Sequence, residues 1–215
     1  MMKSPATPPR DCPLCPRLKA FRDANRAKYP GWFNDPVPSF GPLTARILIA
    51  GLAPGLQGAN RTGRPFTGDW AGDLLYATLL KLKLAKGDYE ERIDDTLELV
   101  DCRIVNSVRC VPPQNKPEPS EIKTCRQFLI SELDAMPNLN TILALGKIAH
   151  DSVLKTLDAR IAAHPFKHGA VYKIGKFQLI SSYHCSRYNT NTGVLTTEMF
   201  ETVVAKAKKL AQAGV

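Results

Sequence analysis

The 215-residue sequence lacks any hydrophobic run long enough to cross a bilayer, which would need about 20 consecutive apolar residues. Residues 1–10 also lack the apolar segment of a secretory signal, so we expect a cytoplasmic protein that does not act at a membrane. Acidic residues are scarce relative to basic ones, at 20 against 29, which gives a formal net charge of +9. This imbalance fits a polyanionic partner, although charge alone does not distinguish DNA, RNA and an anionic membrane.

Internal repeats and long low-complexity tracts are absent too, and the length suits one domain with or without a short appendage. Short apolar runs of strand length alternate with segments whose apolar residues recur at helical spacing. The expected strands are residues 45–50, 101–108, 139–145 and 177–181. The expected helices are residues 17–28, 70–82, 120–135 (with Ser120 as N-cap), 147–157 and 196–211, and a linker near 87–94 is expected to lead to a further short helix. This alternation predicts an α/β fold with a mostly parallel four-stranded central sheet, covered on both faces.

A glycine-rich loop at residues 51–69 joins the first expected strand to the helix that begins near Trp70. Ligands bind at the carboxyl ends of strands in such sheets, and glycines let the backbone approach a ligand closely. The loop offers Arg61 and Arg64 for phosphates, the ring of Phe66 for stacking and the carboxylate of Asp69 for a water molecule. Composition alone is equally compatible with a phosphate loop or a merely convoluted surface loop. The loop lacks the Gly-Lys-Ser/Thr ending of a P-loop, which weakens the interpretation as a nucleotide-phosphate enzyme.

The sequence has six cysteines, which a cytoplasmic protein is not expected to pair as disulfides. Cys12 and Cys15 form a C-x-x-C pair, and Cys110 and Cys125 form a second group after the second expected strand. Four thiolates in two separated groups suit either a tetrahedral zinc ion or an iron–sulfur cluster. The alternative is a set of unrelated buried cysteines, because free cysteine is commonly buried. Cys102 is expected to lie in the core.

Three segments carry a resemblance to a known family. The segment Gly51-Leu-Ala-Pro-Gly, continued by Gly58-Ala-Asn-Arg-Thr-Gly-Arg-Pro-Phe-Thr-Gly-Asp69, closely resembles motif 1 of the family 5 (type b) uracil-DNA glycosylases. The segment Asn106-Ser-Val-Arg-Cys-Val-Pro-Pro-Gln-Asn-Lys-Pro117 resembles the middle motif of that family.

The third segment, His184-Cys-Ser-Arg-Tyr-Asn-Thr-Asn-Thr-Gly193, resembles the family's His-Pro-Ser motif with its trailing Asn and Thr-Gly. The four grouped cysteines match the family's cluster ligands in order and spacing. These matches extend from Cys12 to Gly193, nearly the whole chain. They are highly specific together, although any one alone would not be.

The resemblance implies an α/β/α sandwich that hydrolyses the N-glycosidic bond of uracil in DNA and leaves an abasic site. Hypoxanthine and other deaminated bases are further candidate substrates. It also implies a [4Fe-4S] cluster held by Cys12, Cys15, Cys110 and Cys125. We expect a single domain over residues 1–215 whose N-terminal segment, at about 1–42, is tied to it by the cluster. The expected state is a monomer that acts on deaminated bases in the DNA of the bacterial or archaeal nucleoid.

The sequence departs from the family patterns at two positions. Cys185 stands where the His-Pro-Ser motif usually has Pro, so this loop is expected to be less rigid. The related family 4 enzymes carry Glu after the first Gly of motif 1, and here that position is Leu52. A water-activating carboxylate therefore cannot come from position 52, which directs attention to Asp69.

Breaking a glycosidic bond builds positive charge on the sugar and negative charge on the departing base, which must first be flipped out of the duplex. We assign Asp69 to the water and the cationic sugar, His184 to the base carbonyl and Asn106 to the pyrimidine edge. Gly51, Ala53, Phe66 and Asn189 complete the expected base pocket. Each polar residue also has an ordinary structural alternative: Asp69 as a helix N-cap, Asn106 as a turn residue and His184 as a structural histidine. Phe66 could equally be a core aromatic.

Candidate DNA contacts are more weakly specified, because basic residues at these positions look the same as solvated surface charges. Arg187 and Tyr188 could wedge into the stack where the base has left. The full set of expected DNA-binding residues is Arg61, Arg64, Lys147, Ser186, Arg187 and Tyr188. The main rival to the glycosylase is a metal-stabilised nucleic-acid-binding protein without catalysis. A pure binder has no need of an acid, a histidine and an amide at three strand ends, which favours the enzyme.

Overall fold

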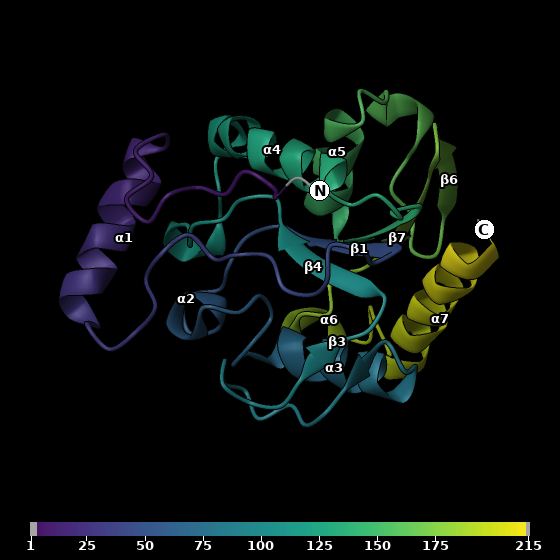
Figure 1. Ribbon diagram of the computed structural model, residues 1–215, viewed down its shortest axis with the longest axis horizontal. Helices are drawn as coiled ribbons and strands as arrows, with labels where there is room; N and C mark the ends of the chain where they lie inside the picture. Colours follow the sequence, from purple (N-terminus) through teal and green to yellow (C-terminus); the bar gives the residue numbers. More distant parts are fainter. Residues whose placement is uncertain (1–3, 214–215) are drawn as a thin grey trace.

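The computed structural model describes residues 4–213 and arranges five strands in one sheet in the order β4-β1-β5-β7-β6 (Figure 1). The strands are β1 (Ile47–Gly51), β4 (Cys102–Asn106), β5 (Thr141–Leu145), β6 (Val171–Ile174) and β7 (Phe177–Ser182). The first four strands in this order are parallel, and β6 pairs antiparallel with β7. Every residue of β1 and β5 is buried, as expected for central parallel strands covered on both faces.

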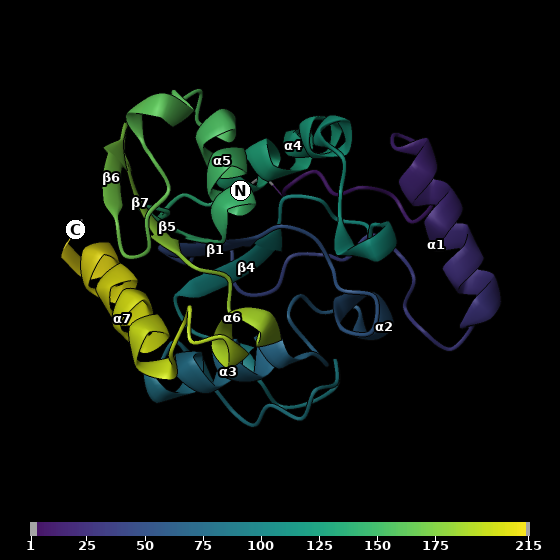
Figure 2. The ribbon, with the colours of Figure 1, turned by 180° about the vertical axis from the view of Figure 1, so that it is seen from behind.

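Helices cover the two faces of the sheet, which confirms the expected three-layer α/β/α sandwich (Figures 1 and 2). On one face, α3 (Trp70–Lys81) and α7 (Thr197–Ala213) share a core with alternate residues of the strands. On the other face, α4 (Pro119–Asp134) and α5 (Lys147–Thr156) bury a second core. None of the helices in the described chain combines the length and the apolar character needed to cross a membrane.

The sheet has one strand more than the four that the sequence predicted. The additional strand, β6, forms a hairpin with β7 through a tight turn at Gly175 and Lys176. Gly175 has a φ of +57°, a left-handed conformation that glycine adopts without steric cost. Tight hairpin turns need such residues, so Gly175 is the sequence feature that indicates this hairpin.

Two helix predictions were wrong at the level of single elements. The N-cap of α4 is Glu118 rather than Ser120, because Pro119 occupies the first helical position and Glu118 forms a capping box with Glu121. The short helix expected after residues 87–94 does not form; residues 87–97 make an irregular loop between β2 (Ala85–Lys86) and β3 (Glu98–Leu99).

Short helices occur inside segments for which the sequence predicted no helix. These are α2 (Ala59–Thr62), α6 (Arg187–Asn191) and the 3-10 turns Pro113–Asn115 and Ile161–Ala163. Two of them, α2 and α6, fall within the first and third motifs. Their few residues give no periodic signal long enough to read from the sequence.

The N-terminal helix α1 (Pro16–Lys28) lies at the side of the sandwich, apart from the sheet (Figure 1). Arg17 forms an ion pair with Glu121 of α4, at 2.7 Å between Nη2 and Oε2. Leu18 is buried in a small apolar cluster together with Phe128. These contacts hold α1 against the start of α4, next to the cysteines discussed below.

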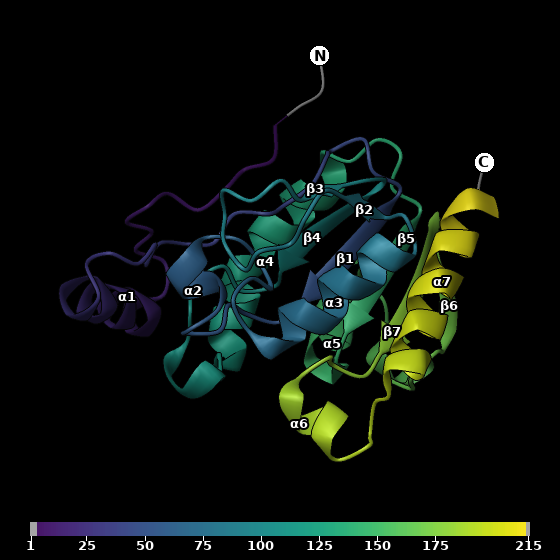
Figure 3. The ribbon, with the colours of Figure 1, turned by 90° about the horizontal axis from the view of Figure 1, so that it is seen from below.

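The carboxyl ends of the parallel strands point toward one end of the sandwich. The segments that follow β1 and β7 supply Asp69 and His184, and Asn106 is the last residue of β4. Figure 3 shows α6, which follows β7, projecting at this end beyond the sheet. The topology therefore brings residues from three distant parts of the chain to one edge of the sheet.

Candidate active site

The segments after β1, β4 and β7 surround a cavity of about 430 Å³ at the carboxyl edge of the sheet. All three residues predicted to be catalytic, Asp69, Asn106 and His184, line it. The predicted pocket residues Ala53 and Phe66 line it as well. The structure thus collects side chains separated by more than 100 residues around one cavity, as the motifs implied.

Asp69 caps the N-terminus of α3 and also borders the cavity. It is the N-cap of α3, where Oδ1 accepts the backbone N–H of Gly72 at 3.1 Å. The other oxygen, Oδ2, lies so close to the backbone that a methyl group on Gly58 would come within 2.3 Å of it. A methyl group on Gly55 would come within 3.2 Å. Two glycines therefore make the space that the carboxylate occupies beside the cavity.

Asn106 is the last residue of β4, and its side chain is almost completely buried. Its Oδ1 has no hydrogen-bond partner among residues 4–213, although burial of such a group is costly. Gly51 ends the adjacent strand, where a methyl group would come within 2.4 Å of this oxygen and 2.8 Å of the Phe66 ring. Gly51 thus leaves room for Asn106 and Phe66 to stand side by side. An unpartnered buried acceptor in a cavity wall is suited to bind a ligand donor.

His184 follows β7 and faces Phe66, with 6.0 Å between the ring centroids. Its ring is partly exposed to the cavity, but protein surrounds it closely enough that desolvation lowers its pKa, while the Asp69 carboxylate opposes this shift. Desolvation is the larger cause, so the imidazole is neutral at neutral pH. A neutral imidazole can donate one N–H to a ligand oxygen without bringing a positive charge into the cavity.

The loop after His184 is anchored from two sides. Asn189 donates its Nδ2 hydrogen to the backbone carbonyl of His184 at 2.8 Å. Cys185 is completely buried, and its Sγ donates to the carbonyl of Ala71 in α3 at 3.4 Å. Asn189 does not line the cavity of the free protein, and its side chain contacts the His184 backbone instead, so its role in binding the base stays a prediction. The Cys185 thiol, at the position where the motif usually has proline, therefore attaches this loop to α3. This contact does not support the expectation that the loop is less rigid.

The mouth of the cavity carries exposed aromatic and basic groups. Trp70, 48% exposed, donates its Nε1 hydrogen to Thr190 Oγ1 at 2.9 Å. The Arg187 guanidinium lies 5.8 Å from the Trp70 ring centroid, and both residues line the cavity. Ser186, a further lining residue, is the N-cap of α6, and Tyr188 is 74% exposed. This group presents flat apolar faces and a positive charge at the cavity entrance.

The other predicted DNA contacts differ in exposure. Arg61 is exposed and donates from Nε to the Gln57 carbonyl at 2.8 Å. Lys147, at the start of α5, is 62% exposed and pairs with Asp151 at 2.5 Å. Both remain accessible to a polyanion.

The prediction that Arg64 contacts DNA was wrong, because its side chain is buried. Its side chain is only 3% exposed, and its guanidinium forms a two-point ion pair with Asp95, whose side chain is fully buried. A guanidinium enclosed in this way cannot reach a DNA phosphate. Its role is structural and concerns the conformation of the first motif.

The four grouped cysteines, Cys12, Cys15, Cys110 and Cys125, line one apolar cavity, and no disulfide joins any of the six cysteines, all of which lie within the described residues. Arg22 donates from Nη1 to Cys110 Sγ at 3.2 Å, and the Arg109 backbone N–H donates to Cys125 Sγ at 3.4 Å. Within residues 4–213, no group of three or more His, Cys, Asp or Glu side chains is preformed around a single metal ion. Four sulfur donors with N–H groups directed at two of them, in an apolar shell, fit the donor chemistry of an iron–sulfur cluster.

The remaining cysteine prediction is confirmed, since Cys102 is fully buried in the core. Trp70 and Asn115 also line the cavity, and the sequence predicts neither as a site residue. The sequence marks Trp70 as the start of a helix, and a tryptophan directly after a candidate acid is a usable signal. Asn115, in the proline-rich loop after β4, also lines the cavity, and no spacing rule predicts that this loop folds back over the first motif.

Comparison with known proteins gives a consistent result. The family model described as the uracil DNA glycosylase superfamily matches residues 38–208. The chain is similar to a type-5 uracil-DNA glycosylase of Thermus thermophilus, with 45% identity over 93% of this chain and 94% of the relative. A type-5 enzyme of Pyrobaculum aerophilum shares 39% identity over 92% and 88% of the two chains. A type-4 uracil-DNA glycosylase of Archaeoglobus fulgidus shares 30% identity over 69% of each.

Proposed function

The chain belongs to the uracil DNA glycosylase superfamily and is an enzyme that excises uracil from DNA; from this premise we propose how its residues carry out the reaction. The observation that carries the proposal is the convergence of three groups on one cavity. These are the unpartnered Asn106 oxygen, the neutral His184 ring and the Asp69 carboxylate. They match the three needs of the reaction: to recognise a base, to stabilise it as it departs and to assist water at the sugar.

Asn106 reads the edge of the flipped base. Uracil presents a ring N–H beside a carbonyl, and an amide side chain offers the complementary acceptor and donor. The buried Oδ1 of Asn106, which has no hydrogen-bond partner within the described residues 4–213, accepts the ring N–H in this arrangement. Phe66, at 7% exposure in the cavity wall, provides a face on which the base stacks. Hypoxanthine also has a carbonyl beside a ring N–H, so it remains a candidate second substrate.

His184 and Asp69 act on opposite partners of the breaking bond. As the bond lengthens, negative charge grows on the base, and the His184 N–H stabilises it at a carbonyl oxygen. Positive charge grows on the sugar, and the Asp69 Oδ2 faces it while holding the attacking water. Leu52 lines the same cavity and carries no carboxylate, so Asp69 is the acid of the first motif that reaches the reaction.

DNA is held around the cavity entrance. The net charge of +9 favours phosphate contacts, for which Arg61, Lys147 and Arg187 are the exposed candidates. Tyr188, an exposed residue in the first turn of α6, would fill the space that the flipped base leaves in the stack. Ser186 caps α6 and so fixes the direction in which this loop leaves the cavity.

The superfamily includes members that carry an iron–sulfur cluster, and the residues that would hold one here are Cys12, Cys15, Cys110 and Cys125. When bound, the cluster would supply a cross-link and no reaction step. It would tie the segment at about residues 1–42 to the loop after β4, making residues 1–215 one domain. Asn106 lies four residues before Cys110, so this cross-link would also stiffen the backbone that carries the base-reading amide. We further propose that the protein acts as a monomer in the cytoplasm.

The proposed function predicts that the purified protein converts a uracil:guanine duplex into a duplex with an alkali-labile abasic site. The matched substrate is the same duplex with cytosine in place of uracil. Because Asn106 in the proposed orientation accepts a ring N–H, which neutral cytosine lacks, the cytosine duplex should remain intact. Equal cleavage of both duplexes, or of neither, would contradict the proposed base recognition.

The cluster proposal predicts that protein prepared without air is brown and contains about four irons per chain. Cys110→Ser should lose most of this iron, because it removes one of four sulfur ligands. Cys102→Ser is the matched control, since Cys102 is also a buried cysteine but lies outside the cysteine cavity. A colourless, active protein that contains zinc and no iron would contradict the proposal.

A further inference from the structure

We propose that the loop at residues 87–97 positions the first motif for catalysis, through Tyr89 and Asp95. None of the loop residues lines the active-site cavity. The loop nevertheless contacts the motif at several points between Arg64 and Gly68, just before the carboxylate of Asp69. The inference rests on the proposed roles of Phe66 and Asp69 and concerns how these residues are held in place.

The first point of attachment is the buried ion pair between Arg64 and Asp95. The distances are 2.7 Å from Nη1 to Oδ1 and 2.6 Å from Nη2 to Oδ2. The same carboxylate accepts the backbone N–H of Glu90 at 3.0 Å and of Leu97 at 3.1 Å. One side chain therefore both folds the 87–97 loop and binds the motif. Because the pair is two-pronged and shielded from water, it fixes direction as well as distance.

The second point is an aromatic enclosure around the same guanidinium. The Arg64 Cζ lies 5.1 Å from the ring centroid of Phe40, 5.5 Å from that of Tyr76 and 5.7 Å from that of Tyr89. A guanidinium at such distances is attracted to the ring faces. Arg64 Nε also donates to Thr67 Oγ1 at 2.8 Å, inside the motif itself. Arg64 thus connects the motif to three separate segments of the chain.

The third point is the hydroxyl of Tyr89. It accepts the backbone N–H of Gly68, the residue before Asp69, at 3.2 Å. It also lies 3.5 Å from the Phe66 carbonyl, to which it donates. The Tyr89 ring packs on Tyr76 with 4.6 Å between centroids, and this packing fixes the position of the hydroxyl.

These contacts surround a backbone that needs external support. Phe66 has a φ of +53° and Gly68 a φ of +81°, both in the left-handed region. A bulky residue adopts this conformation only where its surroundings enforce it. The first turn of α3 packs tightly against the same backbone, because a methyl group on Gly72 would come within 1.9 Å of the Phe66 carbonyl oxygen. Tyr89 and Asp95 are therefore positioning residues, which act through the backbone between the stacking ring and the carboxylate.

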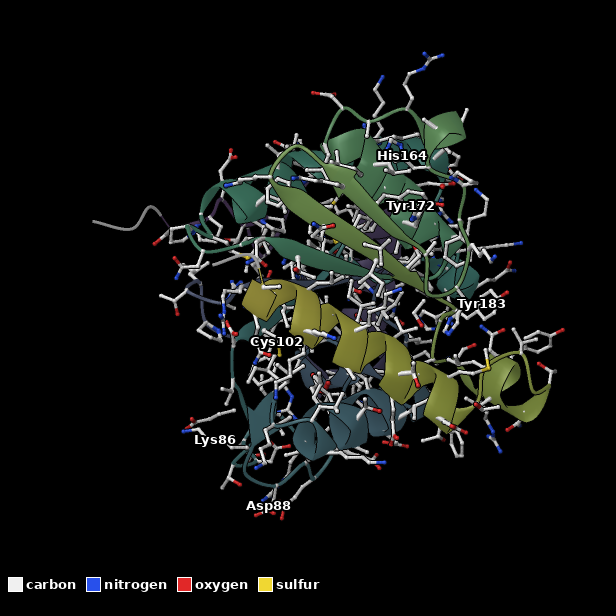
Figure 4. The ribbon with its side chains drawn as sticks, turned by 90° about the vertical axis from the view of Figure 1, so that its right-hand side faces the viewer. Lys86, Asp88, Cys102, His164, Tyr172 and Tyr183 are labelled. Carbon is white, nitrogen blue, oxygen red and sulfur yellow. The ribbon has the colours of Figure 1, made fainter. Side chains whose placement is uncertain are left out.

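The test is Tyr89→Phe, which keeps the packed ring and removes only the hydroxyl. Asp95→Ala would leave the buried Arg64 unpaired and could unfold the protein, so it is the less informative change. The matched control is Tyr172→Phe, which removes a hydroxyl that donates to the Pro165 carbonyl at 2.5 Å. Figure 4 shows Tyr172 at β6 and Asp88, at the start of the loop, on opposite sides of the molecule.

We expect Tyr89→Phe to slow single-turnover excision of uracil by roughly 5- to 50-fold, as for a slight misplacement of reacting groups. Its dissociation constant for abasic duplex DNA should stay within about twofold of the wild type, because no DNA contact is lost. Amide hydrogen exchange should accelerate in residues 66–69 and stay unchanged in β1 and β5. Tyr172→Phe should match the wild type in all three measurements.

Unchanged exchange in residues 66–69 would overturn the inference, and so would faster local exchange with a wild-type excision rate. Exchange that accelerates throughout the sheet would show a merely structural role and would overturn it as well. Failure of the wild-type protein to excise uracil would instead overturn the proposed function. In that case the exchange comparison would still decide whether Tyr89 holds the motif.

Discussion

Asp69→Asn is expected to slow uracil excision by about 10²- to 10⁴-fold, the range that a positioned acid or base contributes. The substitution removes the negative charge that faces the cationic sugar and the acceptor that orients the water. Some excision should remain, because stabilisation of the departing base by His184 does not depend on this carboxylate. Single-turnover rates on a uracil:guanine duplex are the measurement.

Folding should be nearly unaffected by this change, for a geometric reason. The Asp69 oxygen that caps α3 accepts the N–H of Gly72 at 3.1 Å, and the amide oxygen of asparagine can accept the same hydrogen bond. Asparagine also matches the size of aspartate in the narrow space beside Gly58. Asp69→Ala would remove cap and carboxylate together and would confuse the two roles.

Asp73→Asn is the matched control for the charge change. Asp73 lies in the first turn of the same helix but does not line the cavity. The rate of uracil excision by Asp73→Asn should stay close to that of the wild type. A wild-type rate in a folded Asp69→Asn protein would mean that Asp69 is only a helix cap and that the water is positioned by other groups.

His184→Ala is expected to slow base release by roughly tenfold to a thousandfold, the scale for losing one preorganised donor. The loop should remain folded, because its anchors are the Cys185 thiol and the Asn189 amide, and neither uses the His184 ring. Iron content and melting behaviour should therefore match the wild type. His164→Ala is a suitable control, since His164 lies by β6, away from the cavity (Figure 4).

The same substitution should change the pH dependence of stability. Desolvation lowers the pKa of His184 in the folded protein, so the unfolded chain binds this proton at a higher pH. Stability from the neutral ring is present above about pH 6.5 and is lost as pH falls toward the folded pKa. His150 and His168, whose pKa values burial also lowers, add in the same direction. In His184→Ala the free energy of unfolding should fall less steeply over this range, as denaturant titrations would measure.

An insoluble or iron-free His184→Ala protein would make the residue structural and its assigned role wrong. An unchanged pH slope would mean that the ring has the same pKa in the folded and the unfolded chain, so that burial does not favour its neutral form. A slope that changes in the opposite sense would mean that folding favours the protonated ring, which would act as a cation and not as a neutral donor.

The predictable parts of this protein are those encoded in local pattern or contiguous motif. Apolar runs gave the four parallel strands, because burial on both faces leaves an unbroken apolar signature in β1 and β5. The motifs led to Asp69, Asn106 and His184, since Asn106 ends a strand, the other two lie in segments that follow strands, and strand ends meet at one edge. The common cavity of the four cysteines also agrees with their spacing.

The unpredicted parts depend on contacts between distant segments. Arg64 has the same local sequence whether it meets a phosphate or Asp95, and only the folded 87–97 loop decides between them. Asn189 likewise could not be assigned to the His184 carbonyl before α6 was known. The charge of a residue follows from its own identity, whereas its binding partner depends on how distant segments of the chain fold together.

The shared cavity of Leu52 and Asp69 has a consequence for where an acid can stand in this chain. These positions are 17 residues apart in sequence, yet both face the volume in which the base would leave the sugar. In the resembling family 4 pattern, an acid stands at the position of Leu52. A carboxylate at either position would therefore border the same cavity of this chain. A single substitution at position 52 or 69 thus adds or removes an acid beside the sugar without changing the residues that bind the base.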